Sequence, residues 1–145
     1  MLASWHHVGI SVRDMPRALH FYRDLLGFEL EWEHKERGGP ELSKVVGMAE
    51  ARAHIAMLQG YGGRIELFCY LNPEGKDLGP RRQCDFGLIH MALSVRDIRP
   101  LYERLSAAGV DFNCPPQELR PGVTATYMND PEGNTIELVE YQEEA

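Results

Sequence analysis

Residues 7–15 read HVGISVRDM, and residues 90–98 read HMALSVRDI. The two segments share a histidine, a serine, a valine, an arginine and an aspartate at the same spacing. A second motif repeats further along the chain, because residues 65–67 and residues 136–138 both read IEL. Self-similarity of this kind indicates that one structural unit occurs twice in the chain.

Outward from each histidine segment, the pattern predicts a strand, a helix and three further strands. Residues 5–12 are rich in β-branched side chains, which is typical of a strand. Asp14 can cap the helix that follows, Pro16 suits its first turn, and Gly27 ends it. The second copy places the same signals at Asp97, Pro100 and Gly109.

The later strands of each copy are expected between turn sequences. Residues 60–63 and the segment DPEGN at 130–134 are typical of the turn that joins the last two strands. Residues 35–46 predict a loop, with a short helix as the alternative. The expected strands are residues 28–34, 53–58 and 64–70 in the first copy and residues 110–113, 123–129 and 135–141 in the second.

The repeat divides the chain into a first module at residues 1–71, a linker at residues 72–86 and a second module at residues 87–145. The linker is predicted from its prolines, glycines and charged residues. The interval between the two motifs is shorter in the second copy, which fits loops of unequal length.

Four residues of the repeated motifs are candidate metal ligands. His7 begins the first strand of its module and Glu66 lies in the last one, while His90 and Glu137 hold the equivalent places in the second module. Pairing of the modules about a pseudo-twofold axis would bring two imidazoles and two carboxylates together. This set suits one octahedral divalent ion with two open positions, and inward glutamates are costly without a cation. We therefore predict an α+β fold of two tandem βαβββ modules, with mixed sheets curling around a metal-binding cleft.

The repeat also selects among the histidines. His7 aligns with His90, and strand alternation would turn the neighbouring His6 to the opposite face. A lone histidine on a strand is usually structural. The histidines without a counterpart in the other module are interpreted as surface or structural residues: His20, His34 and His54.

Charge and composition exclude several classes of protein. The formal net charge of −7 argues against a nucleic-acid binder, which needs a basic face. No stretch approaches the roughly 20 apolar residues of a membrane span, and the N-terminus has no secretory signal. Three cysteines outside any CxxC pattern argue against a disulfide framework. We expect a cytoplasmic protein.

On these motifs the chain resembles the vicinal oxygen chelate superfamily, which includes glyoxalase, methylmalonyl-CoA epimerase, extradiol dioxygenases, and fosfomycin- and bleomycin-resistance proteins. The doubled unit, the two HxxxSVRD segments and the two IEL segments carry the resemblance over essentially the whole chain. It implies a homodimer and one divalent ion of nickel, cobalt, zinc, manganese or iron, held by His7, Glu66, His90 and Glu137.

The resemblance implies a lyase, isomerase or epimerase that transfers a proton next to the metal-bound carbonyl of a small-molecule substrate. Glu137 or Glu66 would serve as the catalytic base, and resemblance to both the glyoxalase and the epimerase branches favours Glu137. That epimerase typically has glutamine where this chain has Glu66. A non-catalytic protein that binds a small drug or metabolite is the alternative. A ferrous extradiol dioxygenase is less favoured, because those enzymes use two histidines and one glutamate.

Some charged residues outside the repeat are also of interest. Arg64 shares a strand face with Glu66, where it could hold an anionic substrate group or pair with a nearby carboxylate. Arg81 and Arg82 lie in the linker and are expected to be solvated. Glu50 lies before the strand expected at residues 53–58 and is given no role.

Overall fold

The computed structural model describes residues 1–142, so the last three residues of the predicted second module lie outside it. The chain divides into two compact units, which we call unit 1 (Met1–Leu78) and unit 2 (from Gly79 onward). Each unit contains one mixed sheet and its own helices. The predicted α+β fold with two sheets of βαβββ type is thus confirmed.

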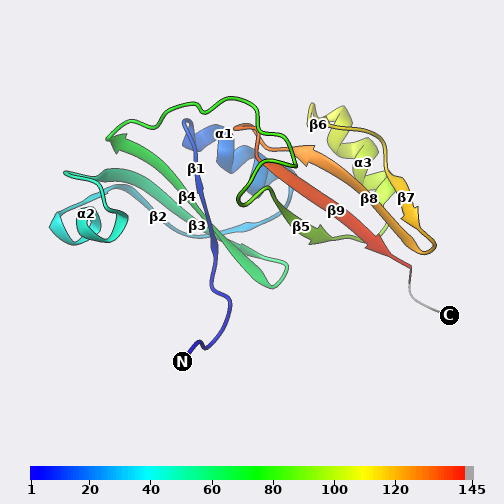
Figure 1. The fold of residues 1–145 in the computed structure, drawn as a ribbon, viewed down its shortest axis with the longest axis horizontal. Coiled ribbons are helices and arrows are strands. Elements are labelled where there is room, and N and C mark those ends of the chain that lie inside the picture. The colour runs from blue at the N-terminus through cyan, green and yellow to red at the C-terminus, as the bar shows by residue number, and fades with distance from the viewer. Residues whose placement is uncertain (143–145) are drawn as a thin grey trace. The chain divides into compact units, whose positions relative to one another are not determined.

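In unit 1 the sheet has the strand order β1-β4-β3-β2 (Figure 1). β1 runs parallel to β4, and the other neighbours are antiparallel. A parallel pair needs a crossover connection, which the helices after β1 begin. The elements are β1 (Val8–Ser11), α1 (Met15–Leu19), η1 (His20–Leu25), β2 (Glu29–Gly38), α2 (Pro40–Val46), β3 (Arg52–Gly60) and β4 (Gly63–Asn72).

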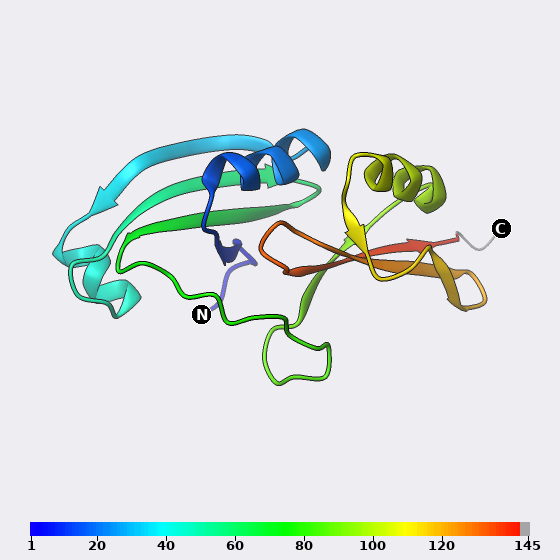
Figure 2. The same ribbon diagram turned by 90° about the horizontal axis from the view of Figure 1, so that it is seen from above.

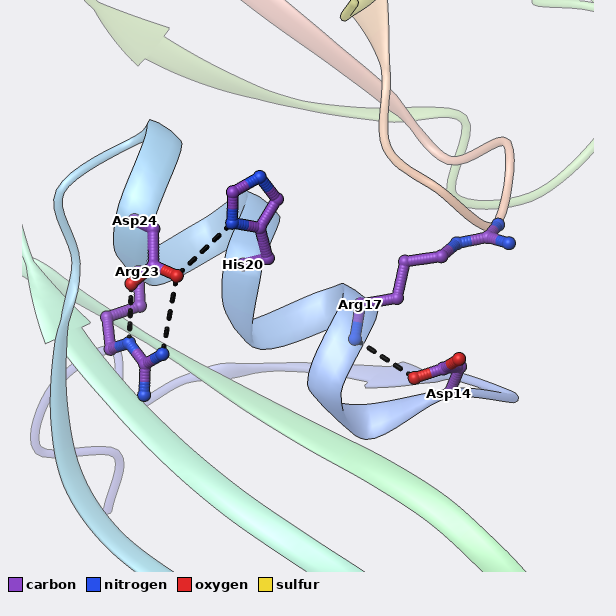
Figure 3. Close-up of polar contacts among 5 residues, drawn as sticks. All are labelled: Asp14, Arg17, His20, Arg23 and Asp24. Atoms are coloured by element: carbon purple, nitrogen blue, oxygen red, sulfur yellow. Dashed lines mark hydrogen bonds and ion pairs between the residues drawn. The ribbon is translucent and has the colours of Figure 1, made fainter. Parts of the chain in front are cut away.

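The crossover helix of unit 1 begins as predicted, since Asp14 Oδ1 accepts a hydrogen bond of 3.0 Å from the backbone N–H of Arg17 (Figure 3). Its second half, η1, is a π-helix. On the exposed side, Asp24 accepts hydrogen bonds from Arg23 at 2.7 Å and from His20 at 3.2 Å (Figure 3). His20 is therefore a surface residue, as predicted.

One face of the unit 1 sheet is covered by this helix (Figure 2). Side chains that alternate toward it are almost fully buried, among them Leu58, Ile65 and Leu67. They share the core with Tyr22 from the helix. Glu66 lies between Ile65 and Leu67 and so projects from the opposite face of the sheet.

Unit 2 repeats this plan with the strand order β5-β9-β8-β6, and β7 also pairs with β8 (Figure 1). β5 and β9 are parallel, and α3 covers one face of the sheet (Figure 2). The elements are β5 (His90–Ser94), α3 (Ile98–Ala107), β6 (Asp111–Phe112), β7 (Gln117–Arg120), β8 (Val123–Asn129) and β9 (Thr135–Tyr141).

The predicted cap of the second helix is wrong. Asp97 has a left-handed backbone (φ 55°, ψ 56°), and its side chain makes no capping hydrogen bond. Glu140 of β9 takes its place, because its Oε1 accepts from the backbone N–H of Ile98 at 3.3 Å. The helix N-terminus is thus satisfied by the sheet on which it packs.

The other differences between the predicted and the observed elements lie mostly in exposed segments. β1 starts at Val8 and not at residue 5, and the predicted strand at 110–113 keeps only two residues. β7 was not expected, because its four residues are all exposed and show no apolar alternation. The short helix considered for residues 35–46 is present as α2. Within residues 1–142, no helix is long and apolar enough to cross a membrane.

Candidate metal centre

The first histidine–glutamate pair joins the N-terminal edge of β1 to the middle of β4. His7 Nε2 lies 3.0 Å from Glu66 Oε2, and the two side chains are 34% and 15% exposed. The parallel register places Gly9 directly beside Glu66, two residues beyond His7. The strand pairing therefore sets the two side chains diagonally across neighbouring strands.

The second pair has the same construction in unit 2. His90 Nε2 lies 3.3 Å from Glu137 Oε2, with 27% and 18% of the side chains exposed. Here Ala92 stands directly beside Glu137, again two residues beyond the histidine. The same residue types thus meet at the same register of both parallel strand pairs.

The donor chemistry of each pair fits a divalent cation. Two ligands at right angles, each about 2.1 Å from a metal ion, are about 3 Å apart, which is close to the separation within each pair. Imidazole nitrogen and carboxylate oxygen are donors for zinc, nickel, manganese and iron. Among the residues that the structure describes, no three His, Cys, Asp or Glu side chains form a group that could hold a metal. The convergence of all four donors in one cleft stays a prediction.

One tyrosine in each unit responds to the charge of the glutamate in the pair. Tyr127 is the cross-strand partner of Glu137, and its ring centroid lies 5.1 Å from that of His90. Burial, and to a lesser extent the charge of Glu137, raises the pKa of Tyr127. Burial and the charge of Glu66 raise the pKa of Tyr70 in the same way. Both phenols therefore keep their hydrogens at neutral pH.

Neither tyrosine was singled out from the sequence, although a signal for Tyr127 exists. Tyr127 and Glu137 are equally distant from the centre of the turn at residues 130–134. A hairpin turn fixes the register of its two strands, so the turn prediction already implied this neighbour. In unit 1 the same relation to the turn at 60–63 puts Met57 beside Glu66.

The two histidines differ in the contact partner of their second ring nitrogen, Nδ1. His90 Nδ1 lies 3.3 Å from the side-chain oxygen of Gln83, whose amide nitrogen donates to Thr135 Oγ1 at 2.8 Å. His7 Nδ1 lies 2.7 Å from Nδ1 of His6. The prediction that His6 turns away from His7 is therefore wrong, because the strand begins only at Val8 and alternation does not reach these residues.

The remaining histidines of unit 1 lie outside the pair. His54 Nε2 is 2.6 Å from Glu33 Oε1, and both side chains are mostly buried. The hydrogen bond to His54 is the main cause that lowers the pKa of Glu33. His34 lies beside Trp32, with ring centroids 5.3 Å apart. These contacts agree with the structural roles expected for both histidines.

Charged residues outside the repeat pair with their neighbours. Arg64 Nε donates to Glu31 Oε2 at 2.8 Å, so it takes the second of the two roles considered for it. This hydrogen bond and the charge of Glu31 raise the pKa of Arg64. Glu50 lines a hollow of about 700 Å³ next to α2, and neither His7 nor Glu66 is among the residues that line this hollow.

Known proteins resemble the chain over nearly its full length. A profile of the Glyoxalase/Bleomycin resistance protein/Dioxygenase superfamily matches residues 4–138. The chain is 32% identical over 142 residues to 2-epi-5-epi-valiolone epimerase from Actinomyces sp., covering 92% of this chain and 77% of that protein. It is 27% identical to a probable lactoylglutathione lyase from Synechocystis sp., covering 92% of both. The crystal structure of a glyoxalase family protein from Bacillus cereus matches with a TM-score of 0.88 and 24% identity, covering 97% of this chain and 95% of that one.

Proposed function

The chain belongs to the Glyoxalase/Bleomycin resistance protein/Dioxygenase superfamily, and from that premise we propose that it is a divalent-metal-dependent isomerase, lyase or epimerase. It moves a proton at the carbon next to a carbonyl group of a small substrate. One observation carries the proposal: a histidine and a glutamate face each other at the same register of both units. The names of two relatives, an epimerase and a lyase, support this reaction class.

The proposed ligands are His7, Glu66, His90 and Glu137, and the ion is nickel, cobalt, zinc, manganese or iron. When bound, such an ion supplies a positive charge that stabilises the negative charge developing on a carbonyl oxygen as the adjacent C–H bond ionises. Imidazole nitrogens and carboxylate oxygens suit all of these ions, so the donor set leaves the choice among them to the test below.

Glu137 is also the proposed base, a role in which its carboxylate would dissociate from the ion. Its carboxylate takes the proton from the carbon and returns it to another carbon or to the opposite face of the same carbon. The first outcome is an isomerisation and the second an epimerisation, and both conserve all atoms of the substrate. Tyr127, the cross-strand partner of Glu137, keeps its phenolic hydrogen, and its ring lies against that of His90.

The test is exchange of a substrate hydrogen with deuterium from the solvent. Protein loaded in turn with nickel, cobalt, zinc, manganese or ferrous iron is incubated in D₂O with hemithioacetals, acyl-CoA thioesters, 2-oxo acids and 2-epi-5-epi-valiolone, and exchange is followed by NMR. We expect exchange next to the carbonyl of at least one class, and its loss on addition of a chelator.

Two results would overturn the proposal. The first is a purified protein that binds none of these metals. The second is a ligand that binds without any exchange and keeps its affinity in Glu137→Gln, which would identify a non-catalytic binding protein. Consumption of oxygen with a catechol and ferrous iron would identify a dioxygenase instead.

A further inference from the structure

The hollow next to α2 lies in unit 1, at the end of the sheet where β4 ends (Figure 1). Its volume of about 700 Å³ falls within the range of small-molecule sites, about 300–1,000 Å³. Asn72 lines it from the last position of β4, six residues beyond Glu66 and therefore about 20 Å along the strand. The hollow is thus separate from the pair of His7 and Glu66.

One peptide group holds the two walls of the hollow. The carbonyl of Glu50 accepts from Asn72 Nδ2 at 2.8 Å, and the N–H of Ala51 in the same peptide group donates to Ser43 Oγ at 2.9 Å. The two side chains bind opposite edges of a planar trans peptide, so they lie roughly 7–8 Å apart. Ala51 is fully buried, and its burial anchors this arrangement. The walls are therefore pre-organised at a fixed spacing.

These bonds leave oxygen atoms available to a ligand at both walls. The oxygen of an amide only accepts hydrogen bonds, so Asn72 Oδ1 is an acceptor, and Ser43 Oγ keeps a second lone pair. The Glu50 carboxylate takes part in no hydrogen bond or ion pair among the described residues. All three residues line the hollow, which therefore presents acceptors at each end.

The charge around the hollow is negative. Arg52 is the single cationic residue that lines it, and its guanidinium already donates to Glu36 Oε1 at 2.5 Å. Glu41 stands at the rim, since a Cβ on the lining residue Gly39 would lie 3.6 Å from Glu41 Oε2. The carboxylates of Glu36, Glu41 and Glu50 thus outnumber one guanidinium. This balance favours a cationic ligand.

We propose that the hollow binds a short aliphatic diamine or polyamine. An ammonium group has three donors and no acceptor, which matches walls that offer acceptors. One ammonium group meets the Glu50 carboxylate and Asn72 Oδ1. The other meets Ser43 Oγ, with Glu41 close by at the rim. The hydrocarbon chain between them lies along Pro40.

The spacing of the walls selects the length of the ligand. An extended chain gains roughly 1.2 Å per single bond, so diaminobutane and diaminopentane span about 6–7 Å between their nitrogens. This length is close to the separation of the two walls, whereas ethylenediamine is too short to reach both. The site requires neither a metal nor the proposed reaction, so it is tested in the metal-free protein and stands or falls by itself.

The first experiment titrates the metal-free protein with amines at pH 7 and low ionic strength, by calorimetry and by ¹H–¹⁵N NMR. Aliphatic amines are protonated at this pH. We expect diaminobutane and diaminopentane to bind about tenfold or more tightly than butylamine and ethylenediamine, and succinate to show no binding. The backbone amide signals of Ser43 and Ala51 should shift on addition of diaminopentane.

The second experiment repeats the titration with charge variants. Glu50→Gln removes a charge-assisted hydrogen bond and should weaken diaminopentane binding about tenfold or more, and Glu50→Lys should abolish it. Glu29→Gln makes the same change of charge at an exposed position of β2, at the opposite end of the sheet, and is the matched control. Circular dichroism of all variants identifies any loss of folding.

Three results would overturn the proposal. Equal weakening in Glu50→Gln and Glu29→Gln would show only a general attraction of cations to a protein with a net charge of −7. Equal affinity for butylamine and diaminopentane would exclude a site with two ends. Absence of binding, or NMR shifts that leave Ser43 and Ala51 unchanged, would exclude the hollow.

Discussion

The two histidine–glutamate pairs have nearly the same separation, 3.0 Å and 3.3 Å, but different surroundings. In unit 2, the side chain of Gln83 contacts His90 Nδ1, and Tyr127 is the cross-strand partner of Glu137. In unit 1, His7 Nδ1 contacts the exposed His6, and Gly9 leaves open space beside Glu66. The proposed metal ligands are thus the same residue types in both units, whereas the residues that contact these ligands differ between the units.

This difference suggests that the two units contribute differently to function. An imidazole held by hydrogen bonds on a sheet is pre-organised, and pre-organised groups make precise ligands and bases. Open space beside a carboxylate, in contrast, leaves room for a ligand. We expect the chemistry to depend more on unit 2 and access to depend more on unit 1.

The largest effect should come from the two glutamates. Glu137→Gln removes the proposed base and should lower the rate of deuterium exchange about 10²- to 10⁴-fold, with metal content measured in parallel. Glu66→Gln should lower it less, since it removes a proposed ligand from the less supported pair. Glu103→Gln, on the exposed side of α3, is the control. A larger loss of exchange rate in Glu66→Gln than in Glu137→Gln would show that the chemistry depends more on unit 1.

The next effect concerns the turns that set the register of each pair. Asp130 is 5% exposed, and its carboxylate accepts from the backbone N–H groups of Glu132 and Asn134 at 2.9 and 2.8 Å. Asp130→Ala leaves these donors unsatisfied and should lower the free energy of unfolding by about 2–3 kcal/mol.

The turn of unit 1 offers the matched variant. Tyr61→Phe removes one exposed hydrogen bond, to the carbonyl of Leu26, and should cost about 1 kcal/mol or less. Urea unfolding of both variants measures the difference. Equal losses would show that the two turns are equally important for stability.

A smaller effect is expected from filling the space beside Glu66. A Cβ at Gly9 would meet no heavy atom within 4 Å, so Gly9→Leu should fold with an unchanged melting temperature. The new side chain should nevertheless lower turnover about tenfold by occupying the room for substrate. Gly75→Leu is the control, because that glycine also has open space around it but lies in the linker. Full activity of Gly9→Leu would show that substrate does not use this side.

The smallest effect concerns the pair of His54 and Glu33, on the opposite face of the unit 1 sheet from Glu66. The folded state lowers the pKa of Glu33 from its ordinary value of 4.5, mainly through the hydrogen bond with His54. This stabilisation is present above about pH 4.5 and is lost as pH falls through the lowered pKa. Glu33→Gln should therefore reduce stability by on the order of 1 kcal/mol at pH 7, and by less at pH 3. Urea unfolding at both pH values checks this, and a loss that is independent of pH would contradict it.

The repeat explains why both pairs could be predicted from the sequence. Alternating apolar residues fix the face that each strand buries, and a shift by one residue would expose the core. Glu66 and Glu137 each stand between two buried aliphatic residues, so their direction follows from the sequence. Their histidines follow from the parallel partner strands.

Other features could not be predicted because they depend on contacts between distant residues. Gln83 reaches His90 only because Arg82 and Asp85 close a turn in a segment without periodicity. The helix cap moved from Asp97 to Glu140, which lies more than forty positions away in the sequence. Hydrogen bonds of this kind leave no local pattern.

The linker is divided between the two units, and this has a consequence for modularity. Asp77 forms an ion pair with Arg13 of unit 1 at 2.9 Å, whereas Gln83 contacts His90 of unit 2. The covalent junction between two independently anchored halves is therefore only a few residues long. A circularly permuted gene, or a split version expressed from two plasmids, should be cut between Asp77 and Arg82. Cutting at residue 86, where composition alone ends the linker, would leave the second half without the amide that holds its histidine.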